Sequence, residues 1–177
     1  MSPFRAPLDR PSRGGGAGAG AVETALGALA RRAMTAAEIG AHLRRKGFPR
    51  AEIESAILRL VELDYVNDAR LTAAFIGTRA VTRGLGPGRV RAELARRGVA
   101  REVIDAELSR SVESGEASPS DAARALEKIV RVKGIPKDRK ERDRVRAALA
   151  RRGFSMSSIS RAMTELAKRE DERGGES

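Results

Sequence analysis

Cysteine and tryptophan are absent from this 177-residue chain, and histidine occurs only once, as His42. Without thiols the chain has neither a disulfide framework nor a thiolate site, and one imidazole leaves no metal site of the usual ligand kinds. The familiar pairs of nucleophile and base are missing, as is a GxxxxGK[ST] phosphate loop. His42 lies at the edge of a helical pattern, where a solvated or partly packed imidazole is the simpler interpretation. We therefore expect a protein that is not an enzyme and holds neither a metal nor a cofactor.

Aromatic residues make up only 3% of the chain, and no apolar run approaches the roughly 20 residues of a membrane-spanning helix. Stacking of bases on aromatic side chains is therefore excluded as a major binding mode. No secretory segment follows Met1. We expect a cytoplasmic protein that does not enter membranes, and the absence of cysteine is in keeping with a reducing compartment.

Acidic residues are in the minority. The chain has 24 Asp and Glu residues against 35 Lys and Arg residues, which gives a formal net charge of +11. Such an excess of positive charge favours an anionic partner, either nucleic acid or an acidic protein surface.

One short pattern occurs three times in the chain. Each copy has apolar residues four positions apart, then cationic residues, a glycine and a further apolar residue; the glycines are Gly47, Gly98 and Gly153. Apolar residues at this spacing predict one face of a helix, and the glycine predicts its end in a left-handed turn. The cations before the glycine complement the negative end of the helix dipole. A skeleton that recurs after 51 and then 55 residues indicates stacked supersecondary units.

Further helical patterns precede and follow each copy, so that each unit contains three helices joined by short turns. We predict an all-α protein, built as a tandem array of three three-helix, helix-turn-helix-like repeats that is elongated and curved. The predicted repeats span residues 21–65, 66–115 and 116–168. Residues 1–20 lack an apolar period and predict a disordered tail, and residues 169–177 predict a frayed one. A polar flexible break is expected over residues 114–120.

Several helix ends are marked by capping residues. Thr35 with Glu38 predicts a capping box for a helix that runs to Lys46. Either Asn67 or Asp68 is expected to cap the helix over residues 69–83, and Ser155 to cap the helix over residues 155–168. The other helices are expected near residues 22–32, from 49 onward, from 87 onward, over 101–113 and 121–131, and from either 137 or 138 to 152.

Three stretches together resemble a known family. They are the turn at residues 44–48 (RRKGF), the segment at residues 60–70 (LVELDYVNDAR) and the segment at residues 83–94 (RGLGPGRVRAEL). The chain is similar in them to the RecX proteins, bacterial regulators of the RecA recombinase. The family usually has Gly-Tyr-Leu-Asp-Asp in the second stretch, so Asp64, Val66 and Asn67 depart from its pattern. The likeness covers about residues 22–168 and is strongest through the first two repeats.

The resemblance implies a helical array that binds in the groove of the RecA–DNA filament. It implies further that the protein blocks growth of the filament and thereby lowers ATP hydrolysis, strand exchange and the stimulation of LexA self-cleavage. We expect it to act as a monomer, with the RecA filament as its partner and DNA phosphates as a second candidate partner.

The candidate binding residues are cations of the repeated pattern. Those before each glycine have an alternative role, because cations at a helix C-terminus stabilise it by ~0.3–1 kcal/mol each. Cations early in these helices oppose the dipole, and an external anion explains them better: DNA phosphates, or acidic patches on a protein filament. The candidates are Arg44, Arg45, Lys46, Arg89, Arg91, Arg96, Arg97, Arg142, Arg144, Arg146, Arg151 and Arg152.

Two further interpretations remain open. The three-helix units would also suit an independent nucleic-acid-binding module that contacts phosphates without base specificity. The glycine-rich loop at residues 84–88 would either present backbone N–H groups to a phosphate or serve only as a hinge, which is the commoner role of such a loop.

Overall fold

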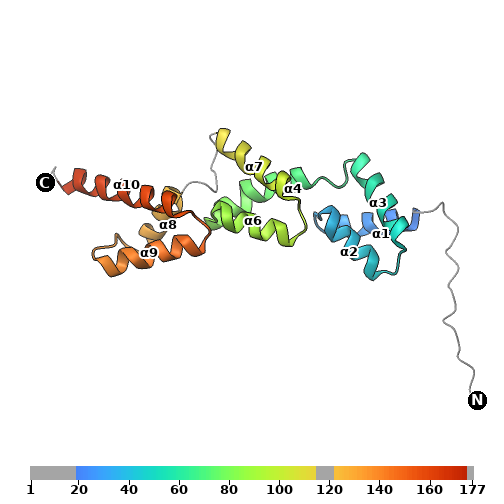
Figure 1. Ribbon diagram of the computed structural model, residues 1–177, viewed down its shortest axis with the longest axis horizontal. Helices are drawn as coiled ribbons and strands as arrows, with labels where there is room; N and C mark the ends of the chain where they lie inside the picture. Colours follow the sequence, from blue (N-terminus) through green and yellow to red (C-terminus); the bar gives the residue numbers. More distant parts are fainter. Residues whose placement is uncertain (1–18, 115–121, 175–177) are drawn as a thin grey trace, which may run out of the picture.

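The computed structural model describes residues 19–114 and 122–174, and within these ranges every regular element is a helix. The helices form three consecutive groups that follow one another along the longest axis of the molecule (Figure 1). The predicted all-α array of three three-helix repeats is therefore confirmed, and the molecule is elongated.

Repeat 1 consists of α1 (Ala19–Leu29), α2 (Ala36–Arg45) and α3 (Arg50–Glu62). The predicted capping box starts α2: the Thr35 hydroxyl accepts a hydrogen bond from the Glu38 amide (3.1 Å), and the Glu38 carboxylate accepts one from the Thr35 amide (3.1 Å). The apolar faces of the three helices enclose a core of Ala21, Ala25, Met34, Ile39, Leu43, Ile53, Ala56, Leu60 and Val66.

Repeat 2 begins with a long helix that changes its winding. It comprises α4 (Asp68–Ala74), the π-helical segment η1 (Phe75–Ala80) and α5 (Val81–Arg83), and it is followed by α6 (Pro87–Arg96) and α7 (Arg101–Glu113). Asn67 caps α4 by accepting a hydrogen bond from the Arg70 amide at 2.9 Å. The core consists of Phe75, Ile76, Ala80, Val90, Leu94, Val99, Ile104 and Leu108.

Repeat 3 consists of α8 (Ala122–Lys133), α9 (Arg139–Arg151) and α10 (Met156–Gly174). The Ser155 hydroxyl accepts a hydrogen bond from the Ser158 amide at 3.2 Å, as expected of the residue that caps α10. The core consists of Ala122, Ala125, Leu126, Ile129, Leu149, Phe154, Ile159, Ala162 and Met163.

Two predicted tails are too long. Helix α1 begins at Ala19, within the tail predicted for residues 1–20, because its first turn packs near Phe48 and the Thr24 hydroxyl donates to the Gly20 carbonyl at 2.8 Å. Helix α10 continues to Gly174, through most of the frayed segment predicted for residues 169–177. Arg169 binds Glu127 of α8 at 2.9 Å and holds this extension to the repeat. Residues 1–18, 175–177 and all but the first residue of the predicted break at 114–120 lie outside the described residues.

The glycine turns are the same in all three repeats. Gly47, Gly98 and Gly153 have φ values of +87°, +79° and +89°. In each turn the amide of the residue after the glycine donates to the carbonyl five residues earlier, as Phe48 does to Leu43 at 3.3 Å. This is the Schellman motif that the sequence pattern predicts. Because α2, α6 and α9 end alike, their final turns present the same shape.

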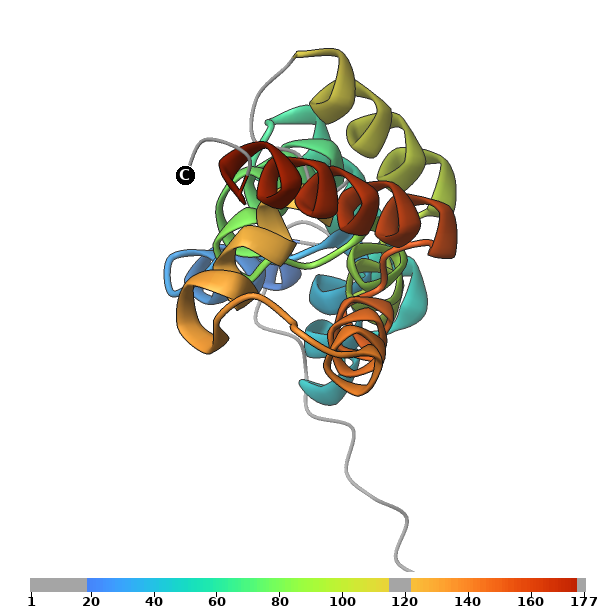
Figure 2. The ribbon, with the colours of Figure 1, turned by 90° about the vertical axis from the view of Figure 1, so that its left-hand side faces the viewer.

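Helices α9, α6 and α2 follow one another end to end along one side of the molecule (Figure 1), and we call this row the column. The last turn of α9 meets the first turn of α6, and the last turn of α6 meets the first turn of α2. The column therefore runs opposite to the order of the repeats in the chain. In the view along the long axis, α9 is seen nearly down its own axis while α10 crosses the view (Figure 2).

We call the contact between α6 and α2 the first joint and the contact between α9 and α6 the second joint. The second joint is made by the backbone. The amides of Gly86 and Gly88 donate to the carbonyls of Arg152 (2.7 Å) and Gly153 (3.0 Å). A Cβ atom on Gly153 would lie 2.2 Å from the Arg89 nitrogen, so only glycine fits there. Lys128 adds two bonds from α8, to the carbonyls of Val81 (2.9 Å) and Thr82 (3.2 Å). Repeats 2 and 3 are thus joined by hydrogen bonds and not by a shared core.

We expect Gly153→Ala to loosen the second joint. Gly134 provides the matched control in the same repeat, because its φ is also positive (+81°) while no atom lies within 4 Å of its added Cβ. Gly134→Ala should lower the free energy of unfolding by about 1–2 kcal/mol through backbone strain alone. Gly153→Ala should lower it by at least about twice as much, since the joint must also open.

Urea unfolding of both variants measures this difference, and small-angle X-ray scattering reports the separation of the repeats. Equal losses of stability in the two variants, with unchanged scattering, would contradict the role assigned to the joint.

Candidate partner-binding surface

The candidate cations lie along the column, on α2, α6 and α9 and on the residues that end these helices. Their helices meet N-terminus to C-terminus, so that the positive end of one helix dipole faces the negative end of the next. The sequence placed the candidates in three separate repeats, and the structure arranges them along one row.

Some of these cations are already paired with acidic residues. Arg89 binds Glu93 at 3.1 Å, and Arg91 binds Asp105 of α7 at 2.6 Å. Arg146 lies 3.4 Å from Asp143. An internal anion therefore accompanies Arg89, Arg91 and Arg146, although their positions early in their helices had suggested an external one. Exposed pairs of this kind are weak, so a partner that offers more than one anion can still compete for them.

The other candidates on the column have no such partner. In residues 19–114 and 122–174, no carboxylate lies within ion-pair distance of Arg44, Arg45, Lys46, Arg96, Arg142, Arg144, Arg151 or Arg152. All of them are exposed except Arg152, which is half-buried against Gly84 at the second joint. These side chains are the groups that remain available to an anionic partner.

Arg97 belongs to the first joint of the column. Its guanidinium donates to the Glu38 carboxylate at 3.0 and 3.1 Å, and its carbonyl accepts from the Thr35 hydroxyl at 2.6 Å. Asp68 completes the joint by accepting from the Ala36 amide at 3.0 Å. Arg97 was predicted as a binding residue. In the structure its guanidinium pairs with Glu38 and so joins repeat 2 to repeat 1.

The Glu38 carboxylate is the electrostatic centre of this joint. Partial burial alone would raise the pKa of Glu38, but hydrogen bonds from Arg97, from the Thr35 amide and from Arg32 outweigh it and lower the pKa to about 2. Glu38 is therefore ionised throughout the physiological range, and the joint keeps its ion pairs.

The glycine-rich loop at residues 84–88 is part of the second joint. The amides of Gly86 and Gly88, which an incoming phosphate would need, donate instead to carbonyls of repeat 3. Gly84 and Gly86 are buried. The amides at these two positions are therefore not free to bind a phosphate. The loop instead connects repeat 2 to repeat 3.

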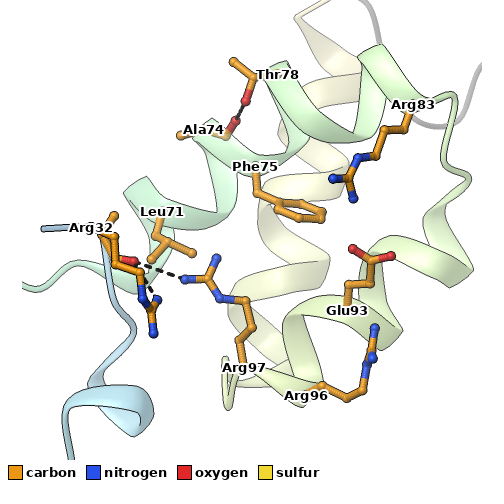
Figure 3. Close-up of a pocket in the computed structure, with 10 residues that line it drawn as sticks. Arg32, Leu71, Ala74, Phe75, Thr78, Arg83, Glu93, Arg96 and Arg97 are labelled. Atoms are coloured by element: carbon orange, nitrogen blue, oxygen red, sulfur yellow. Dashed lines mark hydrogen bonds between the residues drawn. The ribbon is translucent and has the colours of Figure 1, made fainter. Parts of the chain in front are cut away.

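A cavity of about 620 Å³ opens where repeats 1 and 2 meet. Phe75 points into it from η1, and Arg83 and Arg96 lie on opposite sides of the Glu93 carboxylate (Figure 3). Arg32, from the connection between α1 and α2, and Arg97 complete its cationic lining. Arg32 and Arg83 were not among the predicted site residues. No local signal marks them, because Arg32 reaches the cavity only where repeat 1 meets repeat 2, and Arg83 only where α5 lies opposite α6.

No group of His, Asp and Glu side chains in the described part of the chain is arranged to hold a metal ion. None of the helices in residues 19–114 and 122–174 is long and apolar enough to cross a membrane.

Comparison with known proteins gives consistent matches. Family models described as the first, second and third three-helix domains of RecX match residues 21–60, 67–108 and 121–163. A regulatory protein RecX from Halorhodospira halophila is 36% identical over 163 residues, which cover 92% of this chain and 98% of the relative. One from Pseudomonas fluorescens (strain SBW25) is 36% identical over 142 residues, covering 80% and 88%.

Solved structures show the same fold. A crystal structure of RecX from Lactobacillus salivarius matches with a TM-score of 0.72 at 21% identity, over 84% of this chain and 95% of the other. A second crystal structure, of a regulatory protein RecX, matches with a TM-score of 0.65 at 24% identity, over 83% and 71%.

We expect acid to weaken the first joint through Glu38. Its pKa in the folded state, about 2, is below the ordinary value of 4.5. The stability that this carboxylate contributes is therefore complete above about pH 4.5 and is lost as the pH falls towards 2. Glu38→Gln should lower the melting temperature at pH 7. The difference in melting temperature between variant and wild type should narrow as the pH falls from 4.5 to about 2.

Thermal unfolding followed by circular dichroism from about pH 7 to about pH 2 measures the gap. Glu54→Gln is the control, because Glu54 makes only an exposed pair with Arg50. A gap for Glu38→Gln that stays constant with pH, or that is no larger than the gap for Glu54→Gln, would contradict this account of the joint.

Proposed function

This chain belongs to the RecX family of regulatory proteins, and from that premise we propose that it binds the RecA recombinase filament on DNA and limits its extension. Limiting extension would lower the filament's ATP hydrolysis, its strand exchange and its stimulation of LexA self-cleavage. The protein acts in this proposal by binding alone, as a monomer in the cytoplasm.

The observation that best supports the proposal is the row of unpaired cations along the column. A filament of protein on DNA presents negative charge repeatedly along one direction, and an elongated array of repeats offers its contacts along one direction too. Cations spaced over α2, α6 and α9 match such a partner better than they match a small ligand, which would need a compact cluster.

The acceptors on the filament are DNA phosphates or acidic side chains of the recombinase. Arginine and lysine contact phosphates without reading bases, and the low aromatic content leaves little capacity for base stacking. We therefore propose binding that is set by the shape and charge of the filament and not by DNA sequence.

An independent nucleic-acid-binding module is the alternative. The unpaired Arg142, Arg144 and Arg151 of repeat 3 favour it, because they would suit the phosphates of free DNA as well. The alternative requires tight binding to duplex DNA in the absence of RecA, with an affinity that falls steeply as salt rises. A salt titration with and without RecA separates the two functions.

We expect charge reversal on the column to weaken inhibition of the recombinase. The double variant Arg144→Glu/Arg151→Glu removes two exposed, unpaired cations from repeat 3. The concentration needed to halve the DNA-dependent ATPase of RecA should rise by about tenfold or more, because attraction to the filament becomes repulsion.

Arg161→Glu/Lys168→Glu is the matched control. It makes the same change of charge on exposed residues of the same repeat, but on α10, outside the column. The control should inhibit nearly as the wild type does. Equal losses in both double variants would show that net charge alone matters, and an ATPase unaffected by saturating wild-type protein would contradict the proposed function itself.

A further inference from the structure

The column contains two filled joints and one unfilled helix end. The last turn of α9 rests on α6, and the last turn of α6 rests on α2. The last turn of α2, at the far end of the column, repeats the same residue pattern, with Arg44, Arg45 and Lys46 before Gly47. We call this turn the open end.

The space around Gly47, Gly98 and Gly153 distinguishes the open end from the two filled joints. A Cβ atom on Gly98 would lie 2.3 Å from the Ala37 Cβ, and one on Gly153 would lie 2.2 Å from the Arg89 nitrogen. At Gly47 no atom lies within 4 Å of the same position, although its φ of +87° matches the other two. The open end therefore has the shape of a joint, and nothing in the described chain covers its glycine.

The cations at the open end differ from their counterparts in the same way. Lys46 corresponds to Arg97 and Arg152, which are half-buried in their joints, whereas Lys46 is exposed. Arg97 is neutralised by Glu38 across the first joint. Lys46, with Arg44 and Arg45 beside it, has no carboxylate partner in the part of the chain that is described.

The two filled joints show which kind of helix N-terminus would fit the open end. In each of them the last turn meets the N-terminus of another helix, whose first two residues are small: Ala36 and Ala37 of α2, and Pro87 and Gly88 of α6. That N-terminus donates a hydrogen bond to the carbonyl of the residue before the glycine, at 2.6 Å in the first joint and 2.7 Å in the second. In the first joint its third residue, Glu38, also binds the cation.

A second copy of the chain meets these requirements only in part. The N-terminus of α9 is the only column end that another copy would offer within the described residues. It has a carboxylate at its third position, Glu141, as α2 has, but its first two positions are Arg139 and Lys140. Both are large, exposed and of the same charge as Lys46. Within the described residues, the N-terminus of α9 therefore fits the open end less well than those of α2 and α6 fit their joints, and we take a different protein as the occupant.

We infer that the open end of α2 docks onto the N-terminus of a helix in a recombinase subunit, so that this helix extends the column by one member. The fitting helix has small residues in its first turn and a carboxylate near its third position, as α2 itself does. This inference rests on the proposed function and adds to it a specific contact, which the row of column cations does not provide.

The test places a side chain where the joint needs glycine. Asparagine tolerates positive φ, so Gly47→Asn retains the turn while adding atoms that a docked helix would meet. Gly134→Asn carries the same strain at φ +81°, in equally open space outside the column. Binding of fluorescent protein to RecA filaments on single-stranded DNA should weaken by about tenfold or more for Gly47→Asn and by less than about twofold for Gly134→Asn.

The outcomes are distinct. Wild-type protein that does not bind the filament overturns the proposed function, whereas wild-type binding that Gly47→Asn retains in full overturns the docking inference alone. Equal losses in both variants also overturn it, because strain would then be sufficient.

A second measurement leaves Gly47 intact. The chain has no cysteine, so Lys46→Cys accepts a single photocrosslinker. Crosslinks to the first turn of a recombinase helix support the inference, and crosslinks to DNA alone, or to no part of RecA, overturn it.

Discussion

The contact of one helix end with the next holds this molecule in its shape. Each repeat has its own apolar core, so the hydrophobic effect stabilises the three units separately and leaves their relative position to the joints. At those joints a glycine turn brings backbone carbonyls against a helix N-terminus. There the carbonyls accept hydrogen bonds from backbone N–H groups that have no partner within their own helix, or from the hydroxyl of the capping residue. Two joints, each made of several polar contacts, thereby hold the three small bundles in one elongated row.

The same joints decide which cations remain available. Glu38 neutralises the charge of Arg97 in an ion pair, while Arg144 and Arg151 remain exposed along α9. The net charge of +11 is therefore divided between a part that holds the array together and a part that faces outward. The proposed binding along a charged filament would need both, because outward charge without a fixed shape would bind any polyanion.

Much of this could be predicted from the sequence, because the signals are local. The capping box of Thr35 and Glu38 and the turn at Gly98 each lie within a few residues, and helix caps of this kind are specified by adjacent positions. The partners across the joints could not be predicted, since Arg97 and Glu38 are 59 residues apart and meet only when the repeats stack. The Arg91–Asp105 pair was missed for a similar reason, because it joins different helices. The extension of α10 beyond residue 168 depends on a contact with Glu127 that its own sequence does not display.

The central claim is that the joints hold the repeats in one fixed line. The absence of cysteine allows two spin labels to be placed through Lys46→Cys and Lys140→Cys, on α2 and α9 at opposite ends of the column. Pulsed electron–electron resonance on the free protein then measures the distance between them. A single narrow distance distribution is the predicted result. A broad or multiple distribution, from repeats that swing about their connections, would contradict the account.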